Sequence, residues 1–164
     1  MAFDFSLWIN TGSSAEDTER LSNFLTKQKM IQTKLNQYPV TTHFHKDSYF
    51  VKVGGISNIG IRSTKDALEM SLIGFEFFKL LIDAPRFRYA LVGIGLEKWR
   101  DLHEFVTYPK DILLMKGFVV REDIYKKMEA PVITDSSHPS SDIGFFRKGY
   151  LWIPYLGEWE FPFK

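Results

Sequence analysis

Apolar and polar residues alternate at the start of the chain. The apolar set that falls on one side of this alternation is Phe3, Phe5, Leu7 and Ile9. A period of two is typical of a strand that turns one face toward a core. Behind it, Ser13 and Glu16 have the spacing of a capping box, and apolar residues then recur at helical spacing from Leu21 to Leu35. We therefore expect a strand followed by an amphipathic helix.

The next segments predict a hairpin. Residues 41–46 and 49–53 have the β-branched and aromatic composition of two strands, and Lys46, Asp47 and Ser48 form a polar turn between them.

Residues 64–83 carry the clearest pattern in the chain. Their charged residues fall within one narrow stripe at about 100° per residue, and most other positions are apolar. The members of this stripe are Lys65, Glu69, Glu76, Lys79 and Asp83. The pattern predicts a helix that lies inside the core, and Pro85 ends it.

Strand-like and helix-like segments continue to the last residues. Residues 87–96 predict a strand and residues 121–129 a short helix. In the last 21 residues, 150–153 and 158–163 alternate in character on either side of Gly157, which predicts a hairpin. Pro154 and Pro162 favour edge positions for these strands, because proline has no backbone donor.

Together these elements predict an α+β fold. We expect one globular domain over residues 1–164, with a mostly antiparallel sheet of about five to seven strands packed on two main helices. The helix over 64–83 is expected to be central.

Composition narrows the classes of function. The chain has 164 residues, a net charge of +1 and no cysteine. Disulfides and cysteine-ligated metal sites are therefore excluded, and the even charge lacks the basic excess of a nucleic-acid binder. An early acid, Asp4, and the lack of a basic leader predict a cytoplasmic protein without a signal peptide. Glu69, Glu76 and Lys79 interrupt the most apolar segment, so we expect no membrane-spanning helix.

Two histidines are the first candidates for chemistry. His43 and His45 share a face of their predicted strand, so both imidazoles could approach one metal ion. A third ligand would have to come from elsewhere, for example from His103 or Glu104. An isolated pair is more simply the hydrated face of a hairpin, and we expect no cofactor and no metal.

Aromatic residues give the other candidate site. They make up 16% of the chain and are concentrated near its end, where tyrosine and tryptophan are typical of binding surfaces. The predicted partner-binding residues are Tyr150, Trp152, Tyr155, Glu158, Trp159 and Glu160. The alternative is that these rings fill the core.

The function we expect from the sequence is protein binding without catalysis, through the aromatic edge of this hairpin. By analogy of class, a bacterial immunity-type inhibitor has this size and this lack of catalytic motifs. One alternative is a small-ligand binder with a phenylalanine-lined pocket between sheet and helix. Another is an enzyme whose site assembles around His43 and His45 only in the folded chain. The identity of the partner and the oligomeric state are left open.

Overall fold

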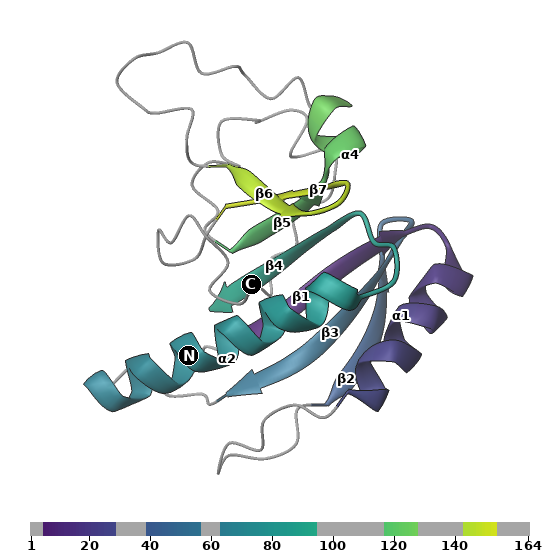
Figure 1. The fold of residues 1–164 in the computed structure, drawn as a ribbon. Coiled ribbons are helices and arrows are strands. Elements are labelled where there is room, and N and C mark those ends of the chain that lie inside the picture. Colours follow the sequence, from purple (N-terminus) through teal and green to yellow (C-terminus); the bar gives the residue numbers. More distant parts are fainter. Residues whose placement is uncertain (1–4, 29–38, 57–62, 95–116, 128–142, 154–164) are drawn as a thin grey trace. The chain divides into compact units, whose positions relative to one another are not determined.

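The computed structural model describes residues 5–28, 39–56, 63–94, 117–127 and 143–153 (Figure 1). The chain divides into two compact units, Met1–Lys98 and Trp99–Lys164, and each is described by itself. The expectation of a single domain stays a prediction.

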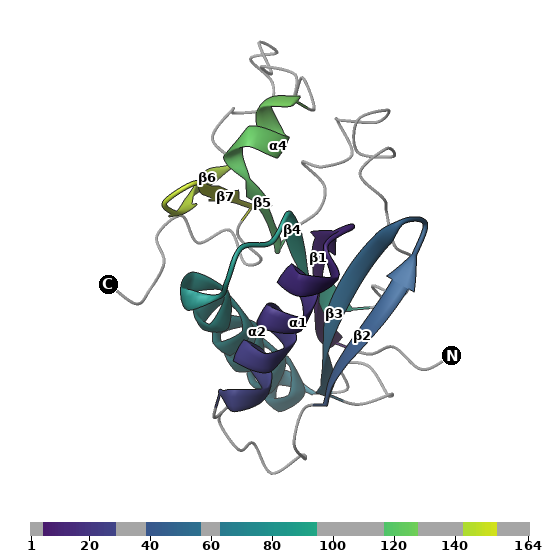
Figure 2. The ribbon, with the colours of Figure 1, turned by 90° about the vertical axis from the view of Figure 1, so that its right-hand side faces the viewer.

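The first unit is a four-stranded antiparallel sheet with two helices. Its elements are β1 (Phe5–Gly12), α1 (Ala15–Lys27), β2 (Val40–His45), β3 (Ser48–Ile56), α2 (Thr64–Asp83) and β4 (Tyr89–Ile94). The strands lie in the order β2-β3-β1-β4. Figure 2 shows both helices on the same face of this sheet, with α1 packed against β2 and β3 and α2 against β4.

Strand β1 is the centre of this unit because β3 and β4 pair with its two sides. Phe5, Leu7 and Ile9 are fully buried, which confirms the predicted core face of this strand. The Phe5 ring stacks on Phe77 of α2 with 6.1 Å between ring centroids. Ser6 and Trp8, on the other face, are also buried, so the expectation of one buried face describes only half of the strand.

Helix α2 has the predicted bounds, but the core does not enclose it. Ile73, Phe77 and Leu81 are buried on one face. Leu68 and Leu72 are 61% and 53% exposed, so the expectation of a single narrow solvated stripe is wrong at these two positions. The charge pattern locates the solvated side of a helix but cannot show how far neighbouring elements cover its apolar residues.

Helix α1 differs from the prediction at both ends. Ser14, and not Ser13, is the N-cap, and its hydroxyl oxygen accepts a hydrogen bond of 3.1 Å from the backbone N–H of Asp17. The helix ends at Lys27, with an extended C-cap at Gln28, so it does not continue toward Leu35 as the apolar spacing suggested. Serines at neighbouring positions offer the same capping chemistry, and the backbone conformation selects between them.

The hairpin of β2 and β3 confirms its prediction. Its turn is Lys46 and Asp47, which both have left-handed backbone conformations, with φ of 44° and 62°. Two such residues are the signature of the tight type I′ turn, whose twist matches that of paired strands.

The second unit contains β5 (Phe118–Arg121), α4 (Glu122–Lys127), β6 (Gly144–Arg147) and β7 (Tyr150–Trp152). Strand β7 pairs antiparallel with both β5 and β6, and Gly149 has a φ of +80° in the turn before it. The predicted pairing of residues 150–153 with 158–163 is therefore wrong, because both edges of β7 are occupied. Residues 158–163 themselves lie outside the described residues.

The described elements confirm the α+β class. They include seven strands, and the register of each described pairing is antiparallel. Within the described ranges, no helix is long and apolar enough to span a membrane.

The two faces of α2 give a test by truncation. Phe77→Ala should lower the free energy of unfolding by about 3–5 kcal/mol, because the ring is fully buried against Phe5. Leu72→Ala should change it by less than about 0.5 kcal/mol, because this side chain faces solvent. Urea unfolding followed by circular dichroism measures both, and equal losses would contradict a one-sided packing of α2.

Candidate functional site

Two of the predicted partner-binding residues lie in the described part of the second unit, and both are buried. Tyr150 is 5% exposed and Trp152 is 2% exposed. The Trp152 ring contacts Phe146 at 5.7 Å between centroids, and the Arg147 guanidinium lies 4.3 Å from the centroid of the Tyr150 ring. These contacts favour the core alternative for these two rings.

The other four residues of the predicted surface are Tyr155, Glu158, Trp159 and Glu160. They lie outside the described residues, so their part in binding stays a prediction. Exposed aromatic surface is found instead at Phe145 of β6, which is 71% exposed, and at Phe44 of β2.

His43 and His45 lie on β2, with both side chains exposed. The Nε2 atom of His43 is 3.0 Å from the Thr41 hydroxyl oxygen, and its ring lies 5.3 Å from the ring of Trp8. The Lys52 ammonium sits over the same indole, 4.9 Å from its centroid. In the part of the chain that the structure describes, no group of three acidic, histidine or cysteine side chains is placed to hold a metal ion. His103 and Glu104 lie outside it.

An acid and a phenol in the second unit have shifted pKa values. Arg121 donates two hydrogen bonds to Asp123, one of them 2.7 Å from Nη2 to Oδ2, and this contact lowers the pKa of the Asp123 carboxyl. Asp123 lies in the first turn of α4, where a carboxylate is favoured by the helix dipole. Burial raises the pKa of the Tyr125 phenol. Both shifts have structural causes and indicate no reaction.

Strand β2 presents an exposed edge of the first unit. It is the last strand of its sheet on one side, and residues 41–45 are all exposed. Its register with β3 runs from Val40 opposite Val53 to His45 opposite Ser48 without a bulge. The strand itself contains no proline, lysine, glutamate or aspartate, which are the residues that usually protect a sheet edge.

The backbone groups of β2 alternate between the hairpin and the outer edge. The N–H of Gly54 donates to the carbonyl oxygen of Pro39 at 2.8 Å, which makes Pro39 and Gly54 a hydrogen-bonded pair. Antiparallel pairs alternate, so Thr41, His43 and His45 direct their backbone groups toward β3. Val40, Thr42 and Phe44 consequently direct theirs toward the outer edge.

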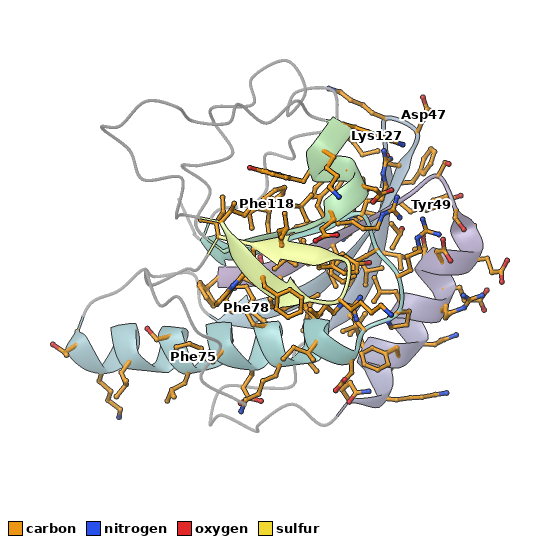
Figure 3. The ribbon with its side chains drawn as sticks, turned by 45° about the horizontal axis from the view of Figure 1, so that its top comes forward. Asp47, Tyr49, Phe75, Phe78, Phe118 and Lys127 are labelled. Carbon is orange, nitrogen blue, oxygen red and sulfur yellow. The ribbon has the colours of Figure 1, made fainter. Side chains whose placement is uncertain are left out.

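The side chains of β2 form two different rows. Val40, Thr42 and Phe44 lie on the sheet face that carries α1 and α2, because their partners in β3 include the buried Val51 and Val53. Phe44 is 61% exposed and contacts the Tyr49 ring at 4.7 Å between centroids. Tyr49 and the turn residue Asp47 are labelled in Figure 3. Thr41, His43 and His45 form a polar row on the other face.

The sequence pattern did not identify β2 as an edge strand. The unbroken run from Val40 to His45 and the short turn were visible, but whether a strand lies at an edge depends on which other strands pair with it. That pairing is decided by residues far away in the chain.

A scan of protein-family models finds no match to this sequence, and searches of curated proteins and of solved structures find none either.

The burial of Trp152 gives a second test. Trp152→Ala should lower the free energy of unfolding of the chain by about 3–5 kcal/mol, because it removes a large ring from a packed site. Phe145→Ala, next to Phe146 in the paired strand but with an exposed side chain, should change it by less than about 0.5 kcal/mol. Thermal unfolding measures both. If the Trp152→Ala chain is as stable as the unmutated one, this ring does not stabilise the core and is again a candidate for binding a partner.

Proposed function

We propose that this chain is a protein-binding domain that takes up an extended segment of its partner as an additional strand along the outer edge of β2. The observation that carries the proposal is the regular, exposed edge of this strand. Addition of a strand uses backbone hydrogen bonds for affinity and alternate side chains for specificity.

Comparison with the other described edge supports this choice. Strand β6 ends the order of the second unit and also has an exposed aromatic residue, Phe145. It is four residues long, its register shifts between Phe145 and Arg147, and Arg147 places a charge in it. Short length, an irregular register and a charge are the ordinary means of blocking pairing at an edge. The edge of β2 has none of these.

The β2 edge offers enough favourable free energy to bind an added strand. Each new backbone hydrogen bond contributes about 0.5–1.5 kcal/mol net, and Val40, Thr42 and Phe44 offer both donors and acceptors. Phe44 adds an exposed ring that a partner side chain can cover, which contributes about 0.2–1 kcal/mol for a direct cross-strand pair.

Protein binding is the class of function that the sequence also favours, and the surface proposed here replaces the buried rings of Tyr150 and Trp152. An inhibitor of the immunity type is one protein of this class. We place it in the cytoplasm, because a chain without cysteine needs no oxidising compartment.

A phenylalanine-lined pocket between sheet and helix has less support. A side chain at Gly74 of α2 would have its Cβ atom 3.3 Å from Cζ of Phe5, so the helix and β1 are already in close contact there. An enzyme built around His43 and His45 has no additional support from the described residues.

Proline at the edge tests the proposal. Thr42→Pro removes an outward N–H and should abolish capture of the partner, whereas Thr42→Val keeps that N–H and should bind within about two-fold of the unmutated chain. The measurement is capture by the immobilised chain from an extract of its own cells, with untagged copies of the chain counted as well. Both variants should keep the circular dichroism of the original, because the Thr42 N–H faces away from β3. Equal capture by the two variants would refute binding at this edge.

A further inference from the structure

We infer that the strand added to β2 is the β2 strand of a second copy of this chain, paired antiparallel about a two-fold axis at Thr42. This inference rests on the proposed function, because it uses the same outer edge. Its argument depends on β2 and α1 of the first unit, which both lie within the described residues. An interface between two identical copies has to be complementary to itself, so the strand must be able to pair with its own sequence.

Strand β2 can pair with itself without bringing like charges together. It contains no lysine, arginine, aspartate or glutamate. Like charges that stand directly opposite each other destabilise a strand pair, so a charged edge resists pairing with a copy of itself. The composition that leaves the edge of β2 unprotected therefore also removes this obstacle to self-pairing.

The register centred at Thr42 uses every outward backbone group of the strand. Val40, Thr42 and Phe44 direct their N–H and C=O groups toward the outer edge. With Thr42 opposite Thr42 of the second copy, Val40 of each chain stands opposite Phe44 of the other, and all three become hydrogen-bonded pairs. Moving the second strand by two residues in either direction would place Val40 or Phe44 opposite a residue beyond β2.

The side chains also match in this register. Each Phe44 ring would lie beside Val40 of the other chain, and an aromatic ring beside a β-branched residue is a favourable cross-strand pair, as is threonine beside threonine at Thr42. On the other face, Thr41 of each chain would stand opposite His43 of the other. Polar residues thus pair with polar ones, and the exposed Phe44 rings of both copies would be covered.

Helix α1 favours a whole second copy over an isolated segment as the occupant. The axis that relates two identical antiparallel strands of one sheet is perpendicular to the sheet, so the second copy brings its own α1 to the same face. Because α1 packs against β2 and β3 (Figure 2), the two helices would be about two strand spacings, or about 9–10 Å, apart. Packed helices lie about 8–10 Å apart, so the helix layer would continue across the interface.

The axis at Thr42 is level with the middle of α1. Through the registers of β2, β3 and β1, Thr42 is level with Ile9, which is two residues before Thr11. The Thr11 hydroxyl lies 2.6 Å from the hydroxyl of Thr18 in α1. Two strand residues span about 7 Å, or about four to five residues of helix, which leads from Thr18 to near the centre of this 13-residue helix.

The two α1 helices would consequently meet with complementary ends. An axis near their centre places the first turn of one helix beside the last turn of the other. The first turn contains Glu16 and Asp17, and the last turn contains Lys27. Arg20 contacts both acids within the chain, and Lys27 of the second copy would add to this attraction together with the opposed helix dipoles. The uncharged strand and the charged helix therefore both fit a second copy.

Opposite charges at Thr42 test both the partner and the register. The unmutated chain should dimerise. Thr42→Lys or Thr42→Glu would place two like charges opposite each other on the axis, whereas a mixture of the two variants would pair a cation with an anion. The dimer dissociation constant of each variant alone should exceed that of the equimolar mixture by on the order of ten-fold. Sedimentation velocity of each chain, alone and mixed, measures these constants.

Position 41 supplies the matched control. Thr41 is exposed in the same strand, but in this register it stands opposite His43 and not opposite itself. Thr41→Lys and Thr41→Glu should therefore dimerise alone and mixed with dissociation constants within about three-fold of each other. Thermal unfolding checks that each variant is folded. A monomeric unmutated chain, or a dimer that responds equally to charges at positions 41 and 42, would overturn the inference.

Engineered disulfides give a second measurement, because the chain has no cysteine of its own. Thr41 and His43 of the other copy would form a non-hydrogen-bonded pair, in which the Cβ atoms come close enough for a disulfide. Mild oxidation should link a Thr41→Cys chain to a His43→Cys chain that carries a tag of different mass. The control pairs Thr41→Cys with Phe44→Cys, whose side chain lies on the opposite face, and should link on the order of ten-fold more slowly. Equal rates would contradict the register.

The results also separate this inference from the function it deepens. If the unmutated chain is a monomer and the cysteine pair links no faster than its control, but Thr42→Pro still abolishes capture of another protein, the inference is wrong and the edge binds a different partner. If Thr42→Pro also has no effect on capture, both proposals are wrong.

Discussion

The need to pair backbone groups on both sides of a buried strand is the constraint on which the first unit depends. All eight residues of β1 are buried, so every N–H and C=O group of this strand must find a partner inside the protein. Pairing with β3 on one side and β4 on the other meets this need. The two helices then cover the face with Phe5, Leu7 and Ile9. Strand β2 stands at the end of this strand order, and its residues 41–45 are exposed.

Local patterns were sufficient to predict much of this fold. The bounds of α2 follow from the stripe of charge, and the β2–β3 hairpin follows from two strand-like runs around Lys46 and Asp47. These signals depend on residues within one or two turns of each other. The position of the N-cap was missed by one residue because Ser13 and Ser14 both have the right chemistry. The length of α1 was overestimated because apolar spacing continues in the sequence after the helix ends at Lys27.

The sequence pattern did not predict which strands lie next to each other in the sheet. Tyr150 and Trp152 are correctly recognised as part of a strand, but their partners are Arg147 and Gly144 of β6 and residues of β5, and not the segment after Gly157. The alternation of a strand shows which side chains share a face and is silent on which strand lies next to it. For the same reason the buried rings were taken as candidates for a surface, while the exposed edge of β2 was not singled out.

The turn at Lys46 and Asp47 affects how a partner would bind. Two residues other than glycine hold left-handed conformations there, and such conformations persist only when the surrounding structure determines them. The turn and the register of β2 are therefore set together by the pairing of β2 with β3 within the single chain. An incoming segment that is unstructured on its own would find its template already ordered, so the loss of conformational entropy on association would fall almost wholly on the incoming chain. The rate of release, more than the rate of encounter, would then respond to changes in the turn.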